Sequence, residues 1–364
     1  MYITGSTSLN LARVSERQGA AEIDIDGLWE ERMKAAIVEG ERKLVIRDVP
    51  EPVLEKDEVL IKVQYCGICG SDLETYTIGA SIGVGHEYSG DIVEVGSDVK
   101  GWKAGDRVVV RPCRPCGMCY WCRRGYEIGV CQQFYAELSQ YKGAFATYTK
   151  AKQDQLYRIP RELGYEHAAM TEPLATPLHA IRVARVQVGD VVAVLGMGPI
   201  GQLTARLAKM AGAKAVYATE ISQSRINLAK NAVDEVIDIN ETDPVNRILE
   251  LTYGMGADIV FECSGSASAT EQALSLVRNG GTIVLVGICM DWVNLPISKI
   301  LLKGLTLKGL IAYTEGEFAI ALNLIKEKRI DVAPLITRKM SLDDINEAFE
   351  KALRGEEGVI LIKP

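Results

Sequence analysis

The stretch "VVAVLGMGPIGQLTARLAKMAGAKAVYATE" (191–220) decides the fold of this 364-residue chain. It opens with an apolar run typical of a buried β-strand (191–195), and a glycine-rich turn follows directly. Apolar residues then recur at helical spacing, and a second strand ends at Glu220. In this strand–turn–helix–strand order, a G-x-G-x-x-G motif predicts a unit that binds a dinucleotide. The motif's glycines are Gly196, Gly198 and Gly201.

The acid at the end of this unit indicates which dinucleotide it binds. Glu220 follows the last glycine by about 20 residues, where an acidic side chain accepts hydrogen bonds from a ribose. We expect NAD, because a carboxylate repels the 2′-phosphate of NADP. Arg225 is a residue type that accommodates this phosphate, so NADP stays open as the alternative. The alternative interpretation of Glu220 is a solvated charge at the end of a strand, without a role in binding.

The rest of the second half continues the alternation of strands and helices. Strand-like runs recur at 235–239, 258–262, 282–287 and 305–310, with helical patterns between them. Six strands that alternate with helices predict an α/β fold with a doubly wound, parallel, six-stranded sheet.

The first half differs in texture and predicts a β-rich domain. Short alternating runs at 58–63, 88–95 and 107–110 are broken by glycine-containing turns. Such runs are typical of Greek-key or barrel structures. After the dinucleotide unit we expect a helix at 316–327, another from Ser341, and a last strand, GVILIK.

Nine cysteines occur in the chain, and five of them fall within CRPCGMCYWCRRGYEIGVC (113–131), here called the cysteine lobe. The spacing of Cys113, Cys116, Cys119 and Cys122 suits thiolates that surround one structural zinc ion. An iron–sulfur cluster is an alternative, because such runs also begin C-x-x-C-x-x-C, although Arg123 follows Cys122 here. Reactive or paired thiols are a further alternative.

Composition limits the possible partners and the compartment. The net charge is −7 and no long basic run occurs, which argues against nucleic acid and anionic membranes. No apolar run approaches the roughly 20 residues of a membrane span, and a secretory signal pattern is missing at the N-terminus. We therefore expect a cytoplasmic protein, in which thiols stay reduced rather than forming disulfides.

Three short motifs supply donors for a second metal ion. They are YCGICGSDLE (65–74), VGHEYSG (84–90) and TEPLA (171–175). A cysteine, a histidine with an adjacent glutamate, and a later glutamate suit a catalytic zinc that keeps one position open.

These motifs, the cysteine lobe and GMGPIG resemble, in the same order, the zinc-dependent medium-chain dehydrogenase/reductase family. The resemblance runs from about Met33 to Pro364 and is to the polyol and secondary-alcohol branch, with sorbitol, butanediol, threonine and glucose dehydrogenases. It implies a GroES-like catalytic domain over 33–175 and 311–364 and a Rossmann domain over 176–310. Residues 1–32 would then be an N-terminal extension.

The resemblance also assigns roles to residues of the catalytic site. Cys69 and His86 resemble the first two zinc ligands, and either Glu87 or Glu172 resembles the third. Asp72 resembles the partner that orients the ligand histidine, and Ser71 the hydroxyl that takes the substrate's proton. The implied cofactor contacts are Gly196, Gly198, Pro199, Ile200, Gly201, Glu220, Arg225, Val286 and Gly287.

In the cysteine lobe the resemblance implies a different ligand set from the spacing alone. Cys116, Cys119, Cys122 and Cys131 resemble the family's structural zinc ligands. The family's last spacing is seven residues, whereas eight lie between Cys122 and Cys131. The set that includes Cys113 instead of Cys131 therefore stays open.

The activity that the resemblance implies is oxidation of a secondary alcohol or polyol to a ketone, with hydride transfer to NAD. It implies two zinc ions per chain, a small-molecule alcohol or ketone as substrate, and a homodimer or homotetramer. An NADP-preferring dehydrogenase and a catalytically silent relative that only binds the cofactor are the alternatives. The particular substrate stays open.

Overall fold

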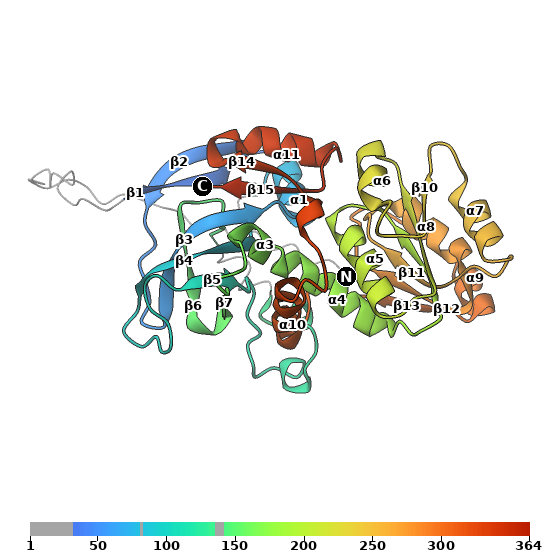
Figure 1. Ribbon diagram of the computed structural model, residues 1–364, viewed down its shortest axis with the longest axis horizontal. Helices are drawn as coiled ribbons and strands as arrows, with labels where there is room; N and C mark the ends of the chain where they lie inside the picture. The colour runs from blue at the N-terminus through green and yellow to red at the C-terminus, as the bar shows by residue number, and fades with distance from the viewer. Residues whose placement is uncertain (1–31, 81–82, 135–141) are drawn as a thin grey trace, which may run out of the picture. The chain divides into compact units, whose positions relative to one another are not determined.

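The computed structural model describes residues 32–80, 83–134 and 142–364 (Figure 1). The extension predicted at the N-terminus lies outside the described residues, except for Arg32, which begins the first strand. All elements below belong to one compact unit, Arg32–Pro364. Within the described ranges, no helix combines the length and the apolar character that crossing a bilayer requires.

The glycine-rich motif lies in a parallel, six-stranded sheet, as predicted. The strand order is β10-β9-β8-β11-β12-β13, so the direction of winding reverses between β8 and β11. In such sheets ligands bind at the carboxyl ends of the strands on either side of this reversal. The strands are β8 (Val191–Leu195), β9 (Ala215–Glu220), β10 (Glu235–Asp238), β11 (Ala257–Glu262), β12 (Val277–Leu285) and β13 (Thr306–Gly309).

Helices cover both faces of this sheet, which is why its central strands are apolar throughout. In Figure 1, α5 and α6 lie on one side of the strands, and α7, α8 and α9 lie on the other. Val192, Val194 and Val260 are completely buried between these layers. The helices are α5 (Pro199–Met210), α6 (Gln223–Ala229), α7 (Pro244–Leu251), α8 (Ala267–Leu276) and α9 (Ile297–Lys303).

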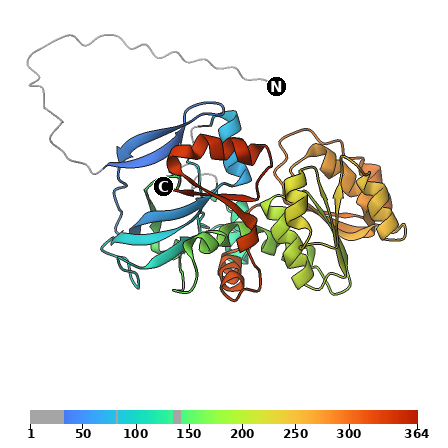
Figure 2. The same ribbon diagram turned by 45° about the horizontal axis from the view of Figure 1, so that its top comes forward.

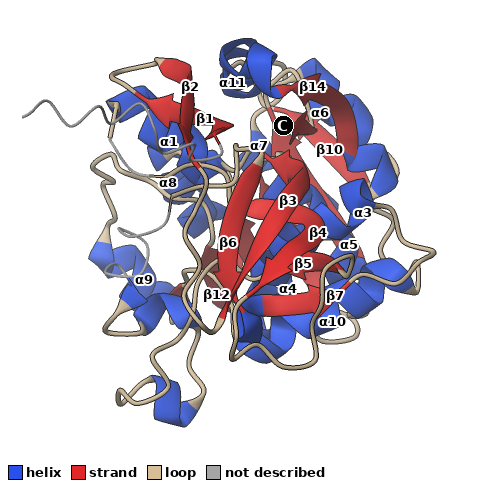
Figure 3. Cartoon of the chain, turned by 90° about the vertical axis from the view of Figure 1, so that its left-hand side faces the viewer, coloured by secondary structure: helices blue, strands red, loops and turns tan. Residues whose placement is uncertain are grey.

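A second, seven-stranded sheet confirms the β-rich character of the first half. Its strand order is β14-β15-β3-β4-β5-β7, and β6 also pairs with β3 (Figure 3). A separate hairpin joins β1 (Arg32–Val38) to β2 (Leu44–Pro50). The seven strands are β3 (Glu58–Gly67), β4 (Glu87–Val95), β5 (Arg107–Val110), β6 (Tyr148–Lys152), β7 (Leu156–Arg158), β14 (Ile336–Ser341) and β15 (Val359–Lys363).

Helices from distant parts of the chain pack around this sheet. The helices α1 and α11 lie side by side (Figures 1 and 2), and the rings of Tyr76 and Phe349 are 5.0 Å apart between them. The helix expected from Ser341 begins later, because Ser341 ends β14 and a 3₁₀ turn follows it. The helices are α1 (Gly70–Ile78), α3 (Tyr165–Ala169), α4 (Thr171–Ala184), α10 (Glu315–Lys326) and α11 (Ile345–Leu353).

Candidate active site

Strand β3 leads into the first predicted zinc ligand. Cys69 is the N-cap residue of α1, and its backbone N–H donates to Asp72 Oδ2 at 3.0 Å. This contact closes the first turn of the helix and fixes the backbone that carries the thiol. Ser71 is half-buried in the same turn.

Asp72 also holds the loop that carries His86. The backbone N–H of Gly85 donates to Asp72 Oδ1 at 2.8 Å, and the same oxygen lies 3.5 Å from His86 Nδ1. Gly85 has a φ of +84°, a conformation that side chains other than glycine's rarely adopt. The Asp72 carboxylate, which is buried, therefore ties both ligand-bearing segments together and faces the imidazole.

The third donor comes from the strand that pairs with β3. Glu87 is the first residue of β4, lies opposite Gly67 in the register, and is buried. A Cβ atom at position 67 would collide with Glu87 Oε2, so glycine leaves the space that the carboxylate occupies. Donor atoms of Cys69, His86 and Glu87 all lie within 4.8 Å of one another; we call these residues the three-donor group.

The charges of the three-donor group fit a cation. Burial raises the pKa of the Cys69 thiol, and burial and Glu172 together raise the pKa of Glu87 to about 8. Burial lowers the pKa of His86, but Asp72 and Cys69 outweigh it and raise that pKa overall. Burial thus favours the protonated forms of Cys69 and Glu87, and a divalent ion between the donors would favour the thiolate and carboxylate forms that bind it.

Glu172 lies near the three-donor group but is not a member of it. It is the second residue of α4 and is buried, and its charge raises the pKa of Glu87. Its Oε1 atom accepts a hydrogen bond of 3.0 Å from the Tyr313 hydroxyl. Tyr313 belongs to no motif and is 141 residues away in the sequence, so sequence reasoning missed it.

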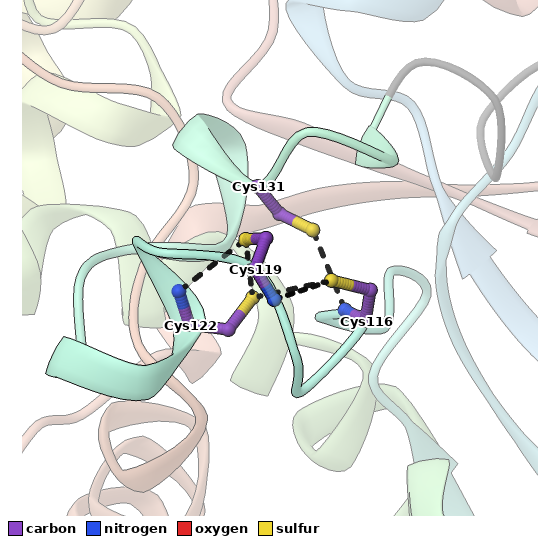
Figure 4. A group of neighbouring side chains, drawn as sticks. All are labelled: Cys116, Cys119, Cys122 and Cys131. Carbon is purple, nitrogen blue, oxygen red and sulfur yellow. Dashed lines mark hydrogen bonds between the residues drawn. The ribbon is translucent and has the colours of Figure 1, made fainter.

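The structure brings four of the five thiols of the cysteine lobe together (Figure 4). The Sγ atoms of Cys116, Cys119, Cys122 and Cys131 lie within 4.8 Å of one another, and Cys113 is outside this group. Backbone N–H groups point at the sulfurs: that of Cys116 donates to Cys131 Sγ at 3.3 Å, and that of Cys119 to Cys116 Sγ at 3.3 Å. Such a cage suits a tetrahedral ion with four thiolate ligands.

Two short turns accommodate the long spacing before the last thiol. The 3₁₀ turn η2 (Cys122–Arg124) ends at Gly125 with a φ of 70°, and a second turn, η3 (Ile128–Val130), precedes Cys131. The extra residue is thereby absorbed, and Cys131 returns to the other thiols.

Backbone donors favour the ionised form of some of these thiols. The N–H of Cys122 and another from Gln132 lower the pKa of Cys119 to about 6. Burial and the neighbouring Cys119 raise the pKa of Cys122 to about 12. Four close thiols cannot all ionise without a cation between them, which is a second fit to a metal ion.

The glycine motif has the tight geometry that its sequence predicts. Gly196 has a φ of 88°, and a Cβ atom at Gly201 would collide with the Gly196 carbonyl oxygen. Gly198 is the N-cap of α5 and Pro199 follows at its first position, so the helix begins directly at the turn. Ile200 is half-buried in the same first turn.

Glu220 is held by backbone groups rather than by solvent. Its Oε2 accepts from the N–H of Met197 at 2.8 Å, and its Oε1 accepts from those of Ile221 at 2.7 Å and Ser222 at 3.0 Å. The carboxylate is buried at the end of β9 and locks the glycine turn in place. The alternative interpretation of Glu220 as a solvated charge is therefore wrong.

The other predicted cofactor residues lie around the same edge of the sheet. Arg225 is close to the turn, because a Cβ atom at Gly198 would lie 3.7 Å from its Nη1. Val286 and Gly287 follow β12, and their N–H groups donate to the carbonyl of Glu262 at 2.9 and 2.8 Å. Sequence reasoning missed Glu262, whose buried carboxylate accepts from the N–H of Ser264 at 2.8 Å.

Two family models match the chain. The alcohol dehydrogenase GroES-like domain matches residues 55–161, and the zinc-binding dehydrogenase model matches residues 199–327. These ranges contain the three-donor group with the cysteine lobe, and the glycine motif from Pro199 onward, respectively.

Individual proteins match over nearly their whole length. A sorbitol dehydrogenase from Halalkalibacterium halodurans is 35% identical over 89% of this chain and 97% of its own. An (R,R)-butanediol dehydrogenase from Bacillus subtilis is 35% identical over 91% of this chain and 100% of its own. A solved structure from Sinorhizobium meliloti, described as a zinc-binding dehydrogenase bound to NADP, is 30% identical and covers 92% of this chain and 100% of its own, with a TM-score of 0.85.

The sequence motifs, the two sheets and these similarities agree with one another. The chain belongs to the zinc-dependent medium-chain dehydrogenase/reductase family, on its polyol dehydrogenase branch, and is an oxidoreductase.

Proposed function

We propose that the protein oxidises a secondary alcohol or a polyol to a ketone and transfers the hydride to NAD. The observation that carries this proposal is the three-donor group, in which a thiol, an imidazole and a carboxylate lie within 4.8 Å of one another. A mixed donor set of three protein ligands is typical of catalytic zinc, which keeps one coordination position for substrate.

Cys69, His86 and Glu87 would hold the ion, and Asp72 orients the imidazole. Zinc bound there supplies a Lewis acid that lowers the pKa of an alcohol oxygen. Ser71 would take the proton that the alcohol gives up. One thiolate and one carboxylate balance the charge of Zn²⁺, whereas a second carboxylate ligand would leave the site negative and a weaker Lewis acid. Glu172, held by Tyr313, is therefore proposed to stay outside the ligand set.

The cysteine lobe is proposed to hold a second zinc ion with a structural role. Four thiolates leave no coordination position for substrate, so this ion can hold the loop but cannot take part in the reaction. Cys116, Cys119, Cys122 and Cys131 are the proposed ligands, and an iron–sulfur cluster is the alternative.

NAD is the proposed coenzyme because of the buried Glu220 carboxylate. A ribose diol can donate to it, whereas a 2′-phosphate would meet a fixed negative charge. NADP is a second candidate for two reasons: Arg225 lies next to the glycine turn, and the Sinorhizobium meliloti relative was solved with NADP.

We further propose a cytoplasmic location, because the cysteines proposed as metal ligands must stay reduced, as thiols do in that compartment. The domain division at 175/176 and 310/311 is likewise proposed, on the two separate sheets that these ranges contain.

A coenzyme-reduction assay with purified protein tests the function. Sorbitol, (R,R)-butanediol and other diols and polyols are offered with NAD, and formation of NADH is followed. We expect turnover of at least one of them, loss of activity on treatment with a strong chelator, and recovery when zinc is returned. Bound zinc and bound NAD without turnover of any alcohol or ketone would instead indicate the silent relative.

A further inference from the structure

Tyr313 connects the cysteine lobe to the carboxylate next to the three-donor group. We propose that Tyr313 is a positioning residue: it is held by the lobe and keeps Glu172 near the three-donor group but outside it. This inference rests on the proposed dehydrogenase function and assigns a role to a residue that no motif includes. Tyr313 is 2% exposed, and its hydroxyl donates to Glu172 Oε1 at 3.0 Å.

The lobe fixes the backbone of Tyr313 from the other side. The N–H of Ile128, in the turn before Cys131, donates to the Tyr313 carbonyl at 2.8 Å. Gly129 is packed so closely that an added Cβ atom would collide with the side chain and carbonyl oxygen of Ile311. The segment 311–313 therefore follows the lobe, and a displaced lobe would displace Tyr313.

A local backbone feature points the same way. Ala312, directly before Tyr313, has a φ of 61°, which costs an L-residue about 1 kcal/mol or more. A residue keeps such a conformation only where its surroundings determine it strongly. Here the Ile128 contact, the Glu172 contact and packing of the Tyr313 ring at 5.8 Å from that of Phe318 provide those surroundings.

The charge of Glu172 explains the proposed role of the Tyr313 hydroxyl. Glu87 and Glu172 are both buried near one another, so like charges oppose their joint presence around one ion. The Tyr313 hydroxyl gives Glu172 a fixed partner away from the donors. Without it, Glu172 is free to enter the ligand set, and the site becomes negative and a weaker Lewis acid.

The first test is Tyr313→Phe, which removes only the hydroxyl, with Tyr157→Phe as the matched control. Tyr157 packs its ring 4.7 Å from the same Phe318, but its hydroxyl faces the Glu315 carbonyl at 3.4 Å instead. We expect kcat of the Tyr313 variant to fall about tenfold to hundredfold, the effect of losing a hydrogen bond to a charged group, with KM changed less than about threefold. The control should match the parent. An unchanged kcat in Tyr313→Phe would overturn the proposal.

A double-mutant cycle separates positioning from a general packing effect. If Tyr313 acts through Glu172, adding Tyr313→Phe to Glu172→Gln should lower kcat no further than Glu172→Gln alone. Effects of the two changes that simply multiply would contradict the proposed coupling.

Cobalt substitution gives a reading that does not depend on turnover. With Co²⁺ in the three-donor site, the visible absorption bands of Tyr313→Phe should differ from those of the parent, because Glu172 enters the ligand set, and those of Tyr157→Phe should not. Identical spectra for the parent and Tyr313→Phe would overturn the proposal. If the parent oxidises no alcohol, the dehydrogenase function fails, and these spectra still decide the position of Glu172.

The link to the lobe is tested with glycine substitutions. Gly129→Ala should push the 311–313 segment away from the lobe and reproduce both the cobalt spectrum and the low kcat of Tyr313→Phe. Gly316→Ala is the control, because an added Cβ atom there meets no atom within 4 Å. A Gly129 variant with parental spectrum and kcat would show that the lobe does not hold Tyr313.

Discussion

At the scale of single residues, backbone hydrogen bonds to Asp72 and the space left by Gly67 hold the three-donor group together. Asp72 accepts from the backbone N–H groups of Cys69 and Gly85, and it faces His86. Gly67 provides the space for Glu87. The site is therefore assembled by the backbone, and a change of donor atom should remove the metal without unfolding the protein.

Cys69→Ser tests this expectation. The half-buried Sγ is replaced by a hydroxyl that binds zinc poorly, so we expect loss of one zinc ion per chain and of nearly all turnover. Tm should stay within about 3 °C of the parent, because α1 keeps its first turn. Metal analysis, the NADH assay and a thermal melt measure these quantities. Cys289→Ser is the control, and a Cys69 variant with full zinc content would refute the ligand assignment.

The contacts of Glu220 lead to a second prediction at this scale, which concerns the preference for NAD over NADP. Its carboxylate accepts from three backbone N–H groups and would repel a 2′-phosphate. We expect kcat/KM to be higher with NAD than with NADP in the parent. Glu220→Gln removes the charge and should narrow that ratio by about tenfold. A parent enzyme that prefers NADP would overturn the assignment and leave Arg225 as the residue that sets the preference.

At the scale of elements, the cysteine lobe contains little regular secondary structure. Its turns, η2 and η3, contain three residues each, and Met118, Tyr120 and Tyr126 are exposed. A loop of this kind folds when its ion binds, because the free energy of metal binding is then free energy of folding.

Cys119→Ser should therefore lose the second zinc ion and lower Tm strongly or prevent folding. Cys113→Ser should keep both zinc ions and the parental Tm, since Cys113 lies outside the group of four thiols. Zinc content and thermal melts compare the two variants. Equal losses in both would restore the ligand set with Cys113, and bound iron with visible absorbance would indicate a cluster instead.

The contacts of Glu317 in the first turn of α10 predict how the stability of the fold depends on pH. Glu317 accepts from the N–H of Thr314 at 2.7 Å and lies 2.9 Å from His179 Nδ1. Burial alone would raise the pKa of Glu317, but these partners outweigh it and lower that pKa. A lowered pKa in the folded state means that the ionised form stabilises the fold above the unfolded pKa of about 4.3. This contribution is lost as the pH falls through the folded pKa.

Glu317→Gln should consequently lower the free energy of unfolding by about 1–2 kcal/mol at pH 7, and the difference should shrink below about pH 4. Thermal melts of the parent and the variant across this range measure it. Glu327→Gln, at the C-cap residue of α10, is the control. A difference that stays constant down to low pH would show that the Glu317 charge does not contribute.

Local patterns predicted most elements, and long-range contacts account for what they missed. The strand before the glycine turn was predicted residue for residue, because buried parallel strands are continuous apolar runs. The strand predicted over 282–287 corresponds to β12, which begins earlier, at Val277. Val277 pairs with Ala257, and a register shift separates this pair from the rest of the ladder. The apolar pattern of the sequence does not indicate such a shift. The motifs of the proposed zinc ligands are visible in the sequence because they are compact, whereas Tyr313 reaches Glu172 only through tertiary packing.

At the scale of the whole molecule, each of the two sheets carries one part of the proposed chemistry. The seven-stranded sheet places Cys69 and Glu87, and the six-stranded sheet places Gly196 and Glu220. The domain boundaries proposed from the sequence stay a prediction, and Tyr313 follows the second of them by only a few residues.

The last prediction concerns assembly and is based on the edge of the six-stranded sheet. Among the described residues β13 pairs with β12 alone, so its other side offers unpaired backbone groups. The segment before it is exposed and apolar; its members include Met290 (83% exposed), Trp292 (99%), Leu301 (76%) and Leu302 (81%).

An apolar patch next to an open strand edge fits a second copy of this chain. A two-fold axis at β13 would pair the strand with its own copy and would bring the two patches together. We expect a homodimer, or a homotetramer built from it, in light scattering and sedimentation. Leu301→Asp combined with Leu302→Asp should halve the mass, because burying these charges is costly. Val53→Asp, an equally exposed apolar site elsewhere, should not change the mass. A monomeric parent, or a double variant with the parental mass, would place assembly elsewhere or exclude it.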